Sequence, residues 1–415
     1  MFTAVISIRW EHLLKKIKNN NLKNKILKQL FFNQSLSCLD LSEQVNKSIP
    51  FVTKVINEMI EENIVIEDGY APSSGGRRPL MYSLKPNEMF IVSVAMDQLT
   101  TRITIIDSLN NYVKPLETYE LLLKDNDNAI PQLIEYIKDY IQRSGIPEKK
   151  IIGVGIGMPG FIDTEKGVNY TFLPTSDKSL QEQLSEALSL PVFIDNDSSL
   201  IALAELKFGM AKSKQTALVI NMSWGVGLGM ILNGELFRGH TGFAGEFSHI
   251  PTSENDTLCS CGKRGCLETE ASLLLVAQKA LDEVKSGTVT SLSTILEMSP
   301  KNAAKAIMEA ANKGDQYAVE LFLNVGYALG KGVAILIHII NPEVIIISGR
   351  GAEIGKILLP SIQQALHKYA IPRLADSTAL SISSMGFDAE IIGAAALVIE
   401  NLDKATSEPV QELMD

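Results

Sequence analysis

The stretch that decides the fold is Gly242-Phe243-Ala244-Gly245-Glu246-Phe247-Ser248-His249, followed ten residues later by Cys259-Ser260-Cys261-Gly262-Lys263-Arg264-Gly265-Cys266-Leu267-Glu268. One histidine and three cysteines supply four ligands, the number and type that close a tetrahedral structural zinc site. These are three of only four cysteines in the chain, and they lie within eight residues. We therefore predict a structural zinc that braces this loop, held by His249, Cys259, Cys261 and Cys266.

The other interpretation of these cysteines is that they are buried thiols or part of a disulfide. Clustering of this kind beside a histidine in an intracellular protein favours metal binding over disulfides. Two acids, Glu246 and Glu268, stand beside the ligands and have no obvious part in binding zinc. A carboxylate is a natural acceptor for a sugar hydroxyl, so the braced loop is expected to shape a small-molecule pocket.

The pattern Gly-x-x-Gly-Glu-x-x-His, and then Cys-x-Cys-Gly-x-x-Gly-Cys-x-Glu, resembles the signature of the ROK family (repressors, open reading frames, kinases). That family joins sugar kinases to transcriptional repressors that use the same kinase-like fold as a sugar sensor. The resemblance implies an α/β two-lobed, actin-like sugar-kinase ATPase fold. It leaves open whether this chain is a kinase or a regulator.

Charge is distributed unevenly along the chain. The 415 residues are 46% hydrophobic, which is ample for sizeable cores, and their net charge of −10 argues against a protein that coats nucleic acid with its whole surface. Residues 1–85 contain 12 Lys and Arg against 8 Asp and Glu, whereas the remainder contains 26 against 40. A basic front end on an acidic body predicts that only the front end meets a polyanion.

Neither a secretory signal nor a membrane span is expected. The apolar residues 1–8 precede the nearby basic residues, and no small-residue cleavage site follows, which is the wrong order for a secretory signal. The longest apolar run, residues 333–348, is interrupted by His338 and by Asn341-Pro342-Glu343. We expect a cytoplasmic protein with no membrane span.

Residues 15–86 carry the pattern of a winged helix-turn-helix domain. Apolar residues at helical spacing predict helices at 22–30 and 41–45, separated by a break, and a third helix with Ser48 as its cap and Pro50 in its first turn. Two short helices joined by a tight turn match a helix-turn-helix, whose second helix enters the major groove of DNA.

Two predicted strands, 63–70 and 79–84, flank a glycine-containing loop that ends in two arginines, the outline of a wing. Arginines on such a loop can follow a phosphate ridge or enter a narrow minor groove. The alternatives are a winged helix used only for protein contacts and a helical bundle with no role on DNA. Our candidates for DNA contact are Ser48, Phe51, Thr53, Lys54, Asn57, Arg77 and Arg78.

From about Met89 the pattern changes to alternating strands and helices. The predicted strands are 90–97, 102–107, 151–156, 192–195, 216–222 and 228–232, and the predicted helices are 130–144 and 198–208. Such repetition predicts two α/β lobes with ligand in the cleft between them. We assign residues 89–200 to the first lobe, with a C-terminal helix, 388–403, packing back on it. Residues 201–387 form the second lobe with the zinc loop, and the tail from Ala405 is predicted to be disordered.

The phosphate-binding turns of a ROK kinase are altered in this chain. The kinases carry Asp-x-Gly-Gly-Thr-Lys after the first strand, where glycine lets backbone amides approach ATP. This chain has Leu99 and Thr100 at the two glycine positions. The second turn keeps Gly225, Gly227 and Gly229, but Trp224 replaces a small residue, so we predict that the chain is not an enzyme.

The sugar-binding positions of the family are better preserved. Asp195-Asn196-Asp197 resembles the Asp-Asn-Asp motif in which the final aspartate of a kinase is the general base, so Asp197 is a vestigial base. Taken alone, that motif fits a helix cap equally well. Ser248 departs from the usual glycine between Glu246 and His249. By correspondence with the family, the sugar-binding residues are Gly157, Pro159, Gly160, Asn196, Asp197, Glu246, His249 and Glu268.

These features favour a sugar-responsive transcriptional regulator, by preference a repressor, that binds operator double-stranded DNA as a homo-oligomer, a dimer or a tetramer. A sugar or sugar derivative is the expected effector, and zinc the expected structural metal. Two rivals remain: an ATP-dependent sugar kinase with Asp197 as its base, and a zinc-stabilised interaction module that has lost both ligand and DNA.

Overall fold

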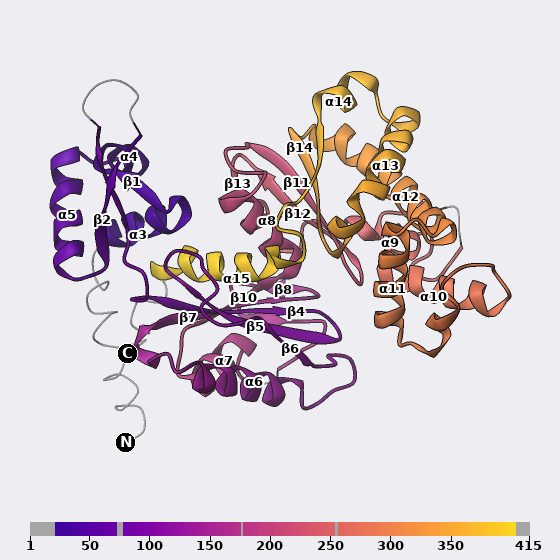
Figure 1. The fold of residues 1–415 in the computed structure, drawn as a ribbon, viewed down its shortest axis with the longest axis horizontal. Helices are drawn as coiled ribbons and strands as arrows, with labels where there is room; N and C mark the ends of the chain where they lie inside the picture. Colours follow the sequence, from indigo (N-terminus) through magenta and orange to yellow (C-terminus); the bar gives the residue numbers. More distant parts are fainter. Residues whose placement is uncertain (1–20, 73–77, 176, 254–255, 404–415) are drawn as a thin grey trace, which may run out of the picture. The chain divides into compact units, whose positions relative to one another are not determined.

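The computed structural model describes residues 21–72, 78–175, 177–253 and 256–403. The chain separates into two compact units: a first unit made of Met1–Asn196 and Ala394–Asp415, and a second unit made of Asp197–Gly393. The chain passes from the first unit to the second after strand β10, and it returns within helix α15 (Figure 1). The predicted wing residue Arg77 and the predicted disordered tail lie outside the described residues.

The N-terminal part of the first unit is a three-helix head with a three-stranded sheet in the order β1-β3-β2. All three predicted helices and both predicted strands are confirmed. The expected break between the first two helices is present, and it contains a short strand that was not predicted: Ser35–Ser37 pairs with β3, and Ser37 forms a capping box with Asp40. The elements are α3 (Asn21–Asn33), β1 (Ser35–Ser37), α4 (Cys38–Gln44), α5 (Ile49–Glu61), β2 (Val65–Tyr70) and β3 (Leu80–Leu84).

The first unit continues with a five-stranded sheet in the order β10-β7-β4-β5-β6. Helices α6 and α7 lie against one face of this sheet and α15 against the other (Figure 1). A Cβ on Gly155 of β7 would collide with the Ala394 carbonyl, so α15 packs directly on the strand. The elements are β4 (Phe90–Met96), β5 (Thr100–Asp107), β6 (Glu117–Glu120), α6 (Ala129–Ser144), β7 (Ile151–Met158), β8 (Ile162–Asp163), β9 (Val168–Asn169), α7 (Leu180–Leu188), β10 (Val192–Asn196) and α15 (Ala389–Glu400).

The end of α15 is held by the head. Lys28 Nζ of α3 donates to the Glu400 carbonyl at 2.8 Å and pairs with Asp403 at 2.9 Å. Asn24 Nδ2 donates to the other oxygen of Asp403 at 2.7 Å. A cation at a helix C-terminus satisfies a free carbonyl and complements the helix dipole. Helix α3 therefore caps α15, which ties the head to the sheet.

The second unit contains a five-stranded sheet in the order β13-β12-β11-β14-β15, covered on one face by α8. Gly332 of helix α12 packs against Phe247 and Leu267, two buried residues that flank the cysteine loop. The elements are α8 (Asp197–Phe208), β11 (Thr216–Met222), β12 (Val226–Leu232), β13 (Glu235–Leu236), α9 (Glu268–Ala271), α10 (Leu273–Lys285), α11 (Pro300–Asn312), α12 (Gln316–Ile340), β14 (Val344–Gly349), α13 (Gly355–Tyr369), α14 (Pro372–Ser377) and β15 (Ala379–Ile382).

Helix α12 is the one helix in the described part of the chain that is long and apolar enough to cross a membrane by length and composition. Inside the structure, 56% of its apolar window is buried. Its contacts with α13 and with the cysteine loop account for that burial. A core helix meets the same length and hydropathy criteria, so these properties alone do not make α12 a membrane span.

Candidate functional site

The four predicted metal ligands come together in the second unit. His249 ends the short helical turn Phe247–His249, and the three cysteines lie on a tight loop closed by a Cys259 N–H bond to the Lys263 carbonyl at 2.8 Å. Gly262 has φ +83°, a conformation that glycine adopts without strain, and this lets the loop turn back on itself. The ligand atoms of all four residues lie within 4.8 Å of one another.

The spacing of these atoms fits a tetrahedral metal. Cys261 Sγ and Cys266 Sγ are 3.6 Å apart, and Cys259 Sγ is 3.6 Å from His249 Nδ1. Zinc–sulfur bonds of about 2.3 Å at the tetrahedral angle put two sulfurs about 3.8 Å apart. All four cysteines are free thiols, so the disulfide interpretation finds no support. The cluster therefore has the composition and size of a site that could hold one metal ion.

The two ring nitrogens of His249 face different partners. Nδ1 points into the cysteine cluster, whereas Nε2 lies 3.6 Å from Glu246 Oε2. A carboxylate near the second nitrogen orients a ligating imidazole. Desolvation raises the pKa of Glu246, with a further contribution from the negative charge of Glu268, although half of the Glu246 side chain stays exposed. Glu246 thus lies close enough to His249 and Glu268 to interact with both electrostatically.

The remaining predicted sugar contact of the second unit, Asp197, lies at the first turn of α8. A Cβ on Gly227 of β12 would collide with Ser198 Oγ, the next residue of that turn. A Cβ on Gly225, the residue just before β12, would lie 3.6 Å from Glu268 Oε1. Gly227 therefore lets α8 approach β12 closely, whereas a side chain at Gly225 would only make ordinary contact with Glu268.

The predicted sugar contacts of the first unit gather at one edge of its sheet. Strands β7 and β10 run parallel, and Asp195 pairs in register with Gly157. Their carboxyl ends therefore meet at the same edge, where ligands bind in open α/β sheets. Asn196 Nδ2 donates to the Gly160 carbonyl at 3.2 Å, and Asn169 Nδ2 donates to the Pro159 carbonyl at 3.2 Å. This edge groups Gly157, Pro159, Gly160 and Asn196.

The head presents most of the described DNA-contact candidates to solvent. Val52, Val55, Ile56 and Met59 are buried on α5, whereas Phe51 is 48% exposed and Lys54 and Asn57 are also exposed. Ser48 is the N-cap position of α5 but makes no side-chain capping bond. Thr53 is half-buried and donates its hydroxyl to the Ile49 carbonyl at 2.9 Å, and Arg78 is exposed.

Comparison with known proteins identifies the family. The ROK family model matches residues 103–401. A xylose repressor from Bacillus spizizenii is 31% identical over 386 residues, which is 91% of this chain and 94% of the relative. The chain belongs to the ROK family. The crystal structure of a ROK family transcriptional regulator, a homologue of the E. coli MLC protein, matches 95% of this chain and 98% of its own with a TM-score of 0.75 and 25% identity. The fold is thus the two-lobed, actin-like ROK fold.

Kinases are also among the ROK relatives. A glucokinase from Halalkalibacterium halodurans is 36% identical over 251 residues, 60% of this chain and 76% of the enzyme. The repressor match spans both units and the head, whereas the glucokinase match covers a smaller part of the chain. Similarity to relatives of both kinds does not by itself distinguish a kinase from a regulator. The structure of the two phosphate-binding turns bears directly on that question.

The first ROK phosphate turn is closed by its own aspartate. Asp97 Oδ1 accepts the backbone N–H groups of Leu99 and Thr100 at 2.8 and 2.7 Å, and Asp97 Oδ2 accepts the Thr100 hydroxyl at 2.9 Å. Backbone amides in such a turn are the groups that would bind phosphate oxygens in a kinase. In this chain the N–H groups of Leu99 and Thr100 donate instead to the Asp97 carboxylate.

The segment that corresponds to the second ROK phosphate turn carries a buried tryptophan. Trp224 is 4% exposed, and the Arg350 guanidinium lies 4.1 Å from its ring centroid. The same guanidinium lies 3.8 Å from the ring of Phe387, so Arg350 is stacked between two aromatic side chains. Sequence analysis singled out Trp224 but missed its partners Arg350 and Phe387, since they are 126 and 163 residues farther along the chain.

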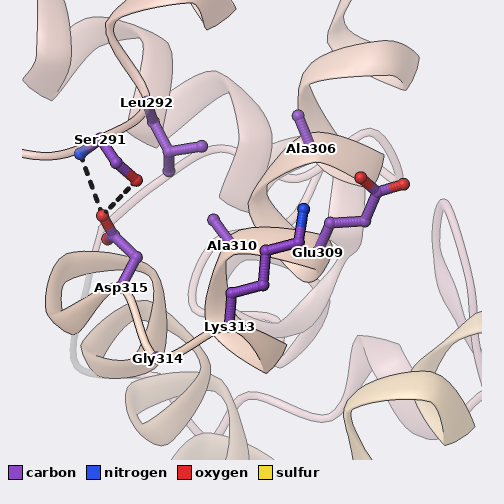
Figure 2. A pocket seen from close by; sticks show the side chains of 8 residues that line it. All are labelled: Ser291, Leu292, Ala306, Glu309, Ala310, Lys313, Gly314 and Asp315. Carbon is purple, nitrogen blue, oxygen red and sulfur yellow. Dashed lines mark hydrogen bonds between the residues drawn. The ribbon is translucent and has the colours of Figure 1, made fainter.

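A separate hollow in the second unit holds no predicted functional residue. It has a volume of about 430 Å³ and lies between α11 and the start of α12 (Figure 2). Asp315 accepts the N–H and hydroxyl of Ser291 at 3.0 and 2.7 Å. Although burial opposes ionisation, hydrogen bonds from Ala318 and Ser291 lower the pKa of Asp315 to about 2. These contacts tie the loop before α11 to the cap of α12, which is a structural role.

Proposed function

We propose that this ROK protein is a sugar-responsive transcriptional regulator, a repressor, that binds operator DNA through its head. The proposal rests on a contrast between the candidate sugar-binding groups and the phosphate-binding turns of the same chain. Two acids that could accept sugar hydroxyls lie beside a cluster that could hold a metal, whereas the amides of the first phosphate turn donate to Asp97 and the second turn carries a tryptophan stacked on Arg350. Full-length similarity to a xylose repressor supports the same conclusion.

The proposed effector is a sugar or sugar derivative recognised by the eight predicted residues. Carboxylate and amide groups fix sugar hydroxyls by hydrogen bonds, and a structural zinc would hold His249 and the loop that carries Glu246 and Glu268 in place. Zinc fits the donor set better than harder metals, because thiolates and imidazole are soft to borderline ligands. We place the protein in the cytoplasm as a dimer or tetramer whose two-fold symmetry matches paired operator half-sites.

The proposed DNA contact of Lys54 predicts a salt-dependent loss of operator binding. In Lys54→Ala, operator affinity is expected to fall several-fold for every DNA sequence, and the slope of log affinity against log salt is expected to decrease by about 1. Fluorescence anisotropy with an operator selected from a random-sequence pool measures both. Lys305→Ala, an exposed lysine of α11, is the matched control and is expected to change neither. Equal wild-type affinity for random DNA would reject the proposed function.

The closed phosphate turns predict that the protein is not a sugar kinase. In a coupled assay with magnesium, ATP and a panel of D-xylose, D-glucose and N-acetylglucosamine, we expect ADP release no faster than without sugar. Kinases turn over at about 1–100 per second, so activity at even a hundredth of that range is detectable. Phosphorylation of any sugar in the panel at such rates would make the kinase alternative correct.

A further inference from the structure

Strand β11 carries a buried amide in an otherwise apolar sequence. Its residues Thr216–Met222 read Thr-Ala-Leu-Val-Ile-Asn-Met, and Asn221 is 4% exposed. A buried side-chain amide costs free energy unless hydrogen bonds replace those it made with water. Asn221 Oδ1 is buried and accepts no hydrogen bond from any described residue. Leaving such an acceptor unsatisfied costs free energy, so stability alone does not explain an amide at this position.

The amide nitrogen of Asn221 donates hydrogen bonds to the first turn of α8. Nδ2 donates to Asp197 Oδ2 at 3.2 Å and to Ser198 Oγ at 3.1 Å. The other carboxylate oxygen, Asp197 Oδ1, accepts the Ser198 N–H at 2.7 Å and the Ser198 hydroxyl at 3.1 Å. These bonds form a closed ring of three side chains. The ring fixes both torsions of the Asp197 side chain and therefore the plane of its carboxylate.

The surrounding backbone makes room for this ring. Gly349, at the end of β14, has φ +68°, and a Cβ there would collide with Asn221 Oδ1. Gly227 leaves the corresponding space for Ser198 Oγ. Strand β11 thus places Asn221 against the first turn of α8, β12 leaves a gap there for Ser198 Oγ, and β14 leaves a gap for Asn221 Oδ1. Such a supporting set of contacts is typical of a side chain held ready for a ligand.

We propose that Asn221 is a positioning residue for sugar recognition: it holds the Asp197 carboxylate in one orientation so that the acceptor is in place before the sugar hydroxyl arrives. This inference rests on the proposed function. An acceptor that is already ordered loses less conformational entropy on binding, and ordering one side chain is worth about a 2- to 10-fold change in affinity. Asn221 acts through Asp197, so its effect disappears when Asp197 no longer binds the sugar.

A double-mutant cycle on the full-length, zinc-loaded protein tests the proposal. Sugar affinity is measured by isothermal titration calorimetry with the tightest binder among D-xylose, D-glucose and N-acetylglucosamine. Asn221→Leu is expected to weaken binding about 10-fold and Asp197→Asn to weaken it further. The double variant is expected to bind as weakly as Asp197→Asn alone, because the two residues form one unit. Asn221→Ala, which removes the amide without adding bulk, serves the same cycle if the leucine variant does not fold.

The control is Ser348→Ala, which lies opposite Asn221 in the register of β11 and β14 and is also buried, with a hydroxyl that has no partner among the described residues. It is expected to leave sugar affinity unchanged. Full additivity in the cycle, or an unchanged affinity in the Asn221 variants, would overturn the positioning role while leaving the proposed function intact. If the wild type binds no sugar, the proposed function fails, and crystal structures of the variants decide the positioning role: an Asp197 carboxylate in its wild-type orientation would refute it.

Discussion

Replacing Cys261 by serine is expected to empty the metal site and destabilise the second unit. Cys261 is the exposed member of the cluster, so the substitution removes a ligand but little buried packing. Structural zinc contributes directly to folding free energy, and losing about 3–5 kcal/mol in a unit of this size lowers the melting temperature by about 10 °C. We expect about one zinc per wild-type chain by elemental analysis and about none in Cys261→Ser.

Chelation separates the metal from the side chain itself. Wild-type protein stripped of metal is expected to melt at the same temperature as Cys261→Ser, and the variant is expected to be insensitive to the chelator. Cys38→Ser, which replaces the cysteine of the head, is the matched control and should keep both its zinc and its chelator response. Carefully purified wild-type protein that contains no metal, or a Cys261→Ser protein with full metal and unchanged melting temperature, would contradict the metal assignment.

Removing the Glu268 carboxylate is expected to abolish most of the sugar response. Hydrogen bonds to charged groups are worth about 1.5–3 kcal/mol, so Glu268→Ala should weaken sugar binding about 10- to 100-fold. Glu268→Gln keeps one acceptor oxygen without the charge and is expected to fall between the alanine variant and the wild type. Thermal shift against the sugar panel measures the loss, because a ligand that binds only the native state raises the melting temperature.

The controls for Glu268 distinguish recognition from folding. Zinc content and operator affinity without sugar should stay at wild-type values in both Glu268 variants, since the carboxylate is not among the four ligand groups. Glu235→Ala, an exposed acid on β13, should leave the sugar-induced shift unchanged. Should Glu268→Ala retain the full shift with its zinc in place, Glu268 would not belong to the sugar site.

The parts of the protein that sequence predicted well depend on local patterns. The apolar stripe of α5 and the clustered ligands from His249 to Cys266 are each encoded within about twenty residues, so spacing alone reveals them. The strand β1 was missed because only three residues form it, and its pairing partner β3 is more than forty positions away. The helices α10 to α14 were not predicted, because their apolar faces are explained only by the elements that they cover.

The supporting contacts of the candidate site were beyond the reach of sequence for the same reason. Asn221 looks like one polar residue in a strand, and its role appears only when α8 brings Asp197 to within 3.2 Å. Arg350 and Phe387 are likewise distant in sequence from Trp224, and no spacing rule joins them. An unexpected polar residue in a buried strand was the one available signal.

Helix α15 has a thermodynamic consequence for regulation. Its first residues belong to the second unit and its last turn to the first. There, Lys28 of the head donates to the Glu400 carbonyl at the end of the helix, and Asn24 donates to Asp403 just beyond it. If α15 couples sugar binding to DNA binding by the head, thermodynamic linkage requires each ligand to change the affinity for the other. Operator DNA must then change the dissociation constant of the sugar by the same factor by which the sugar changes that of the operator.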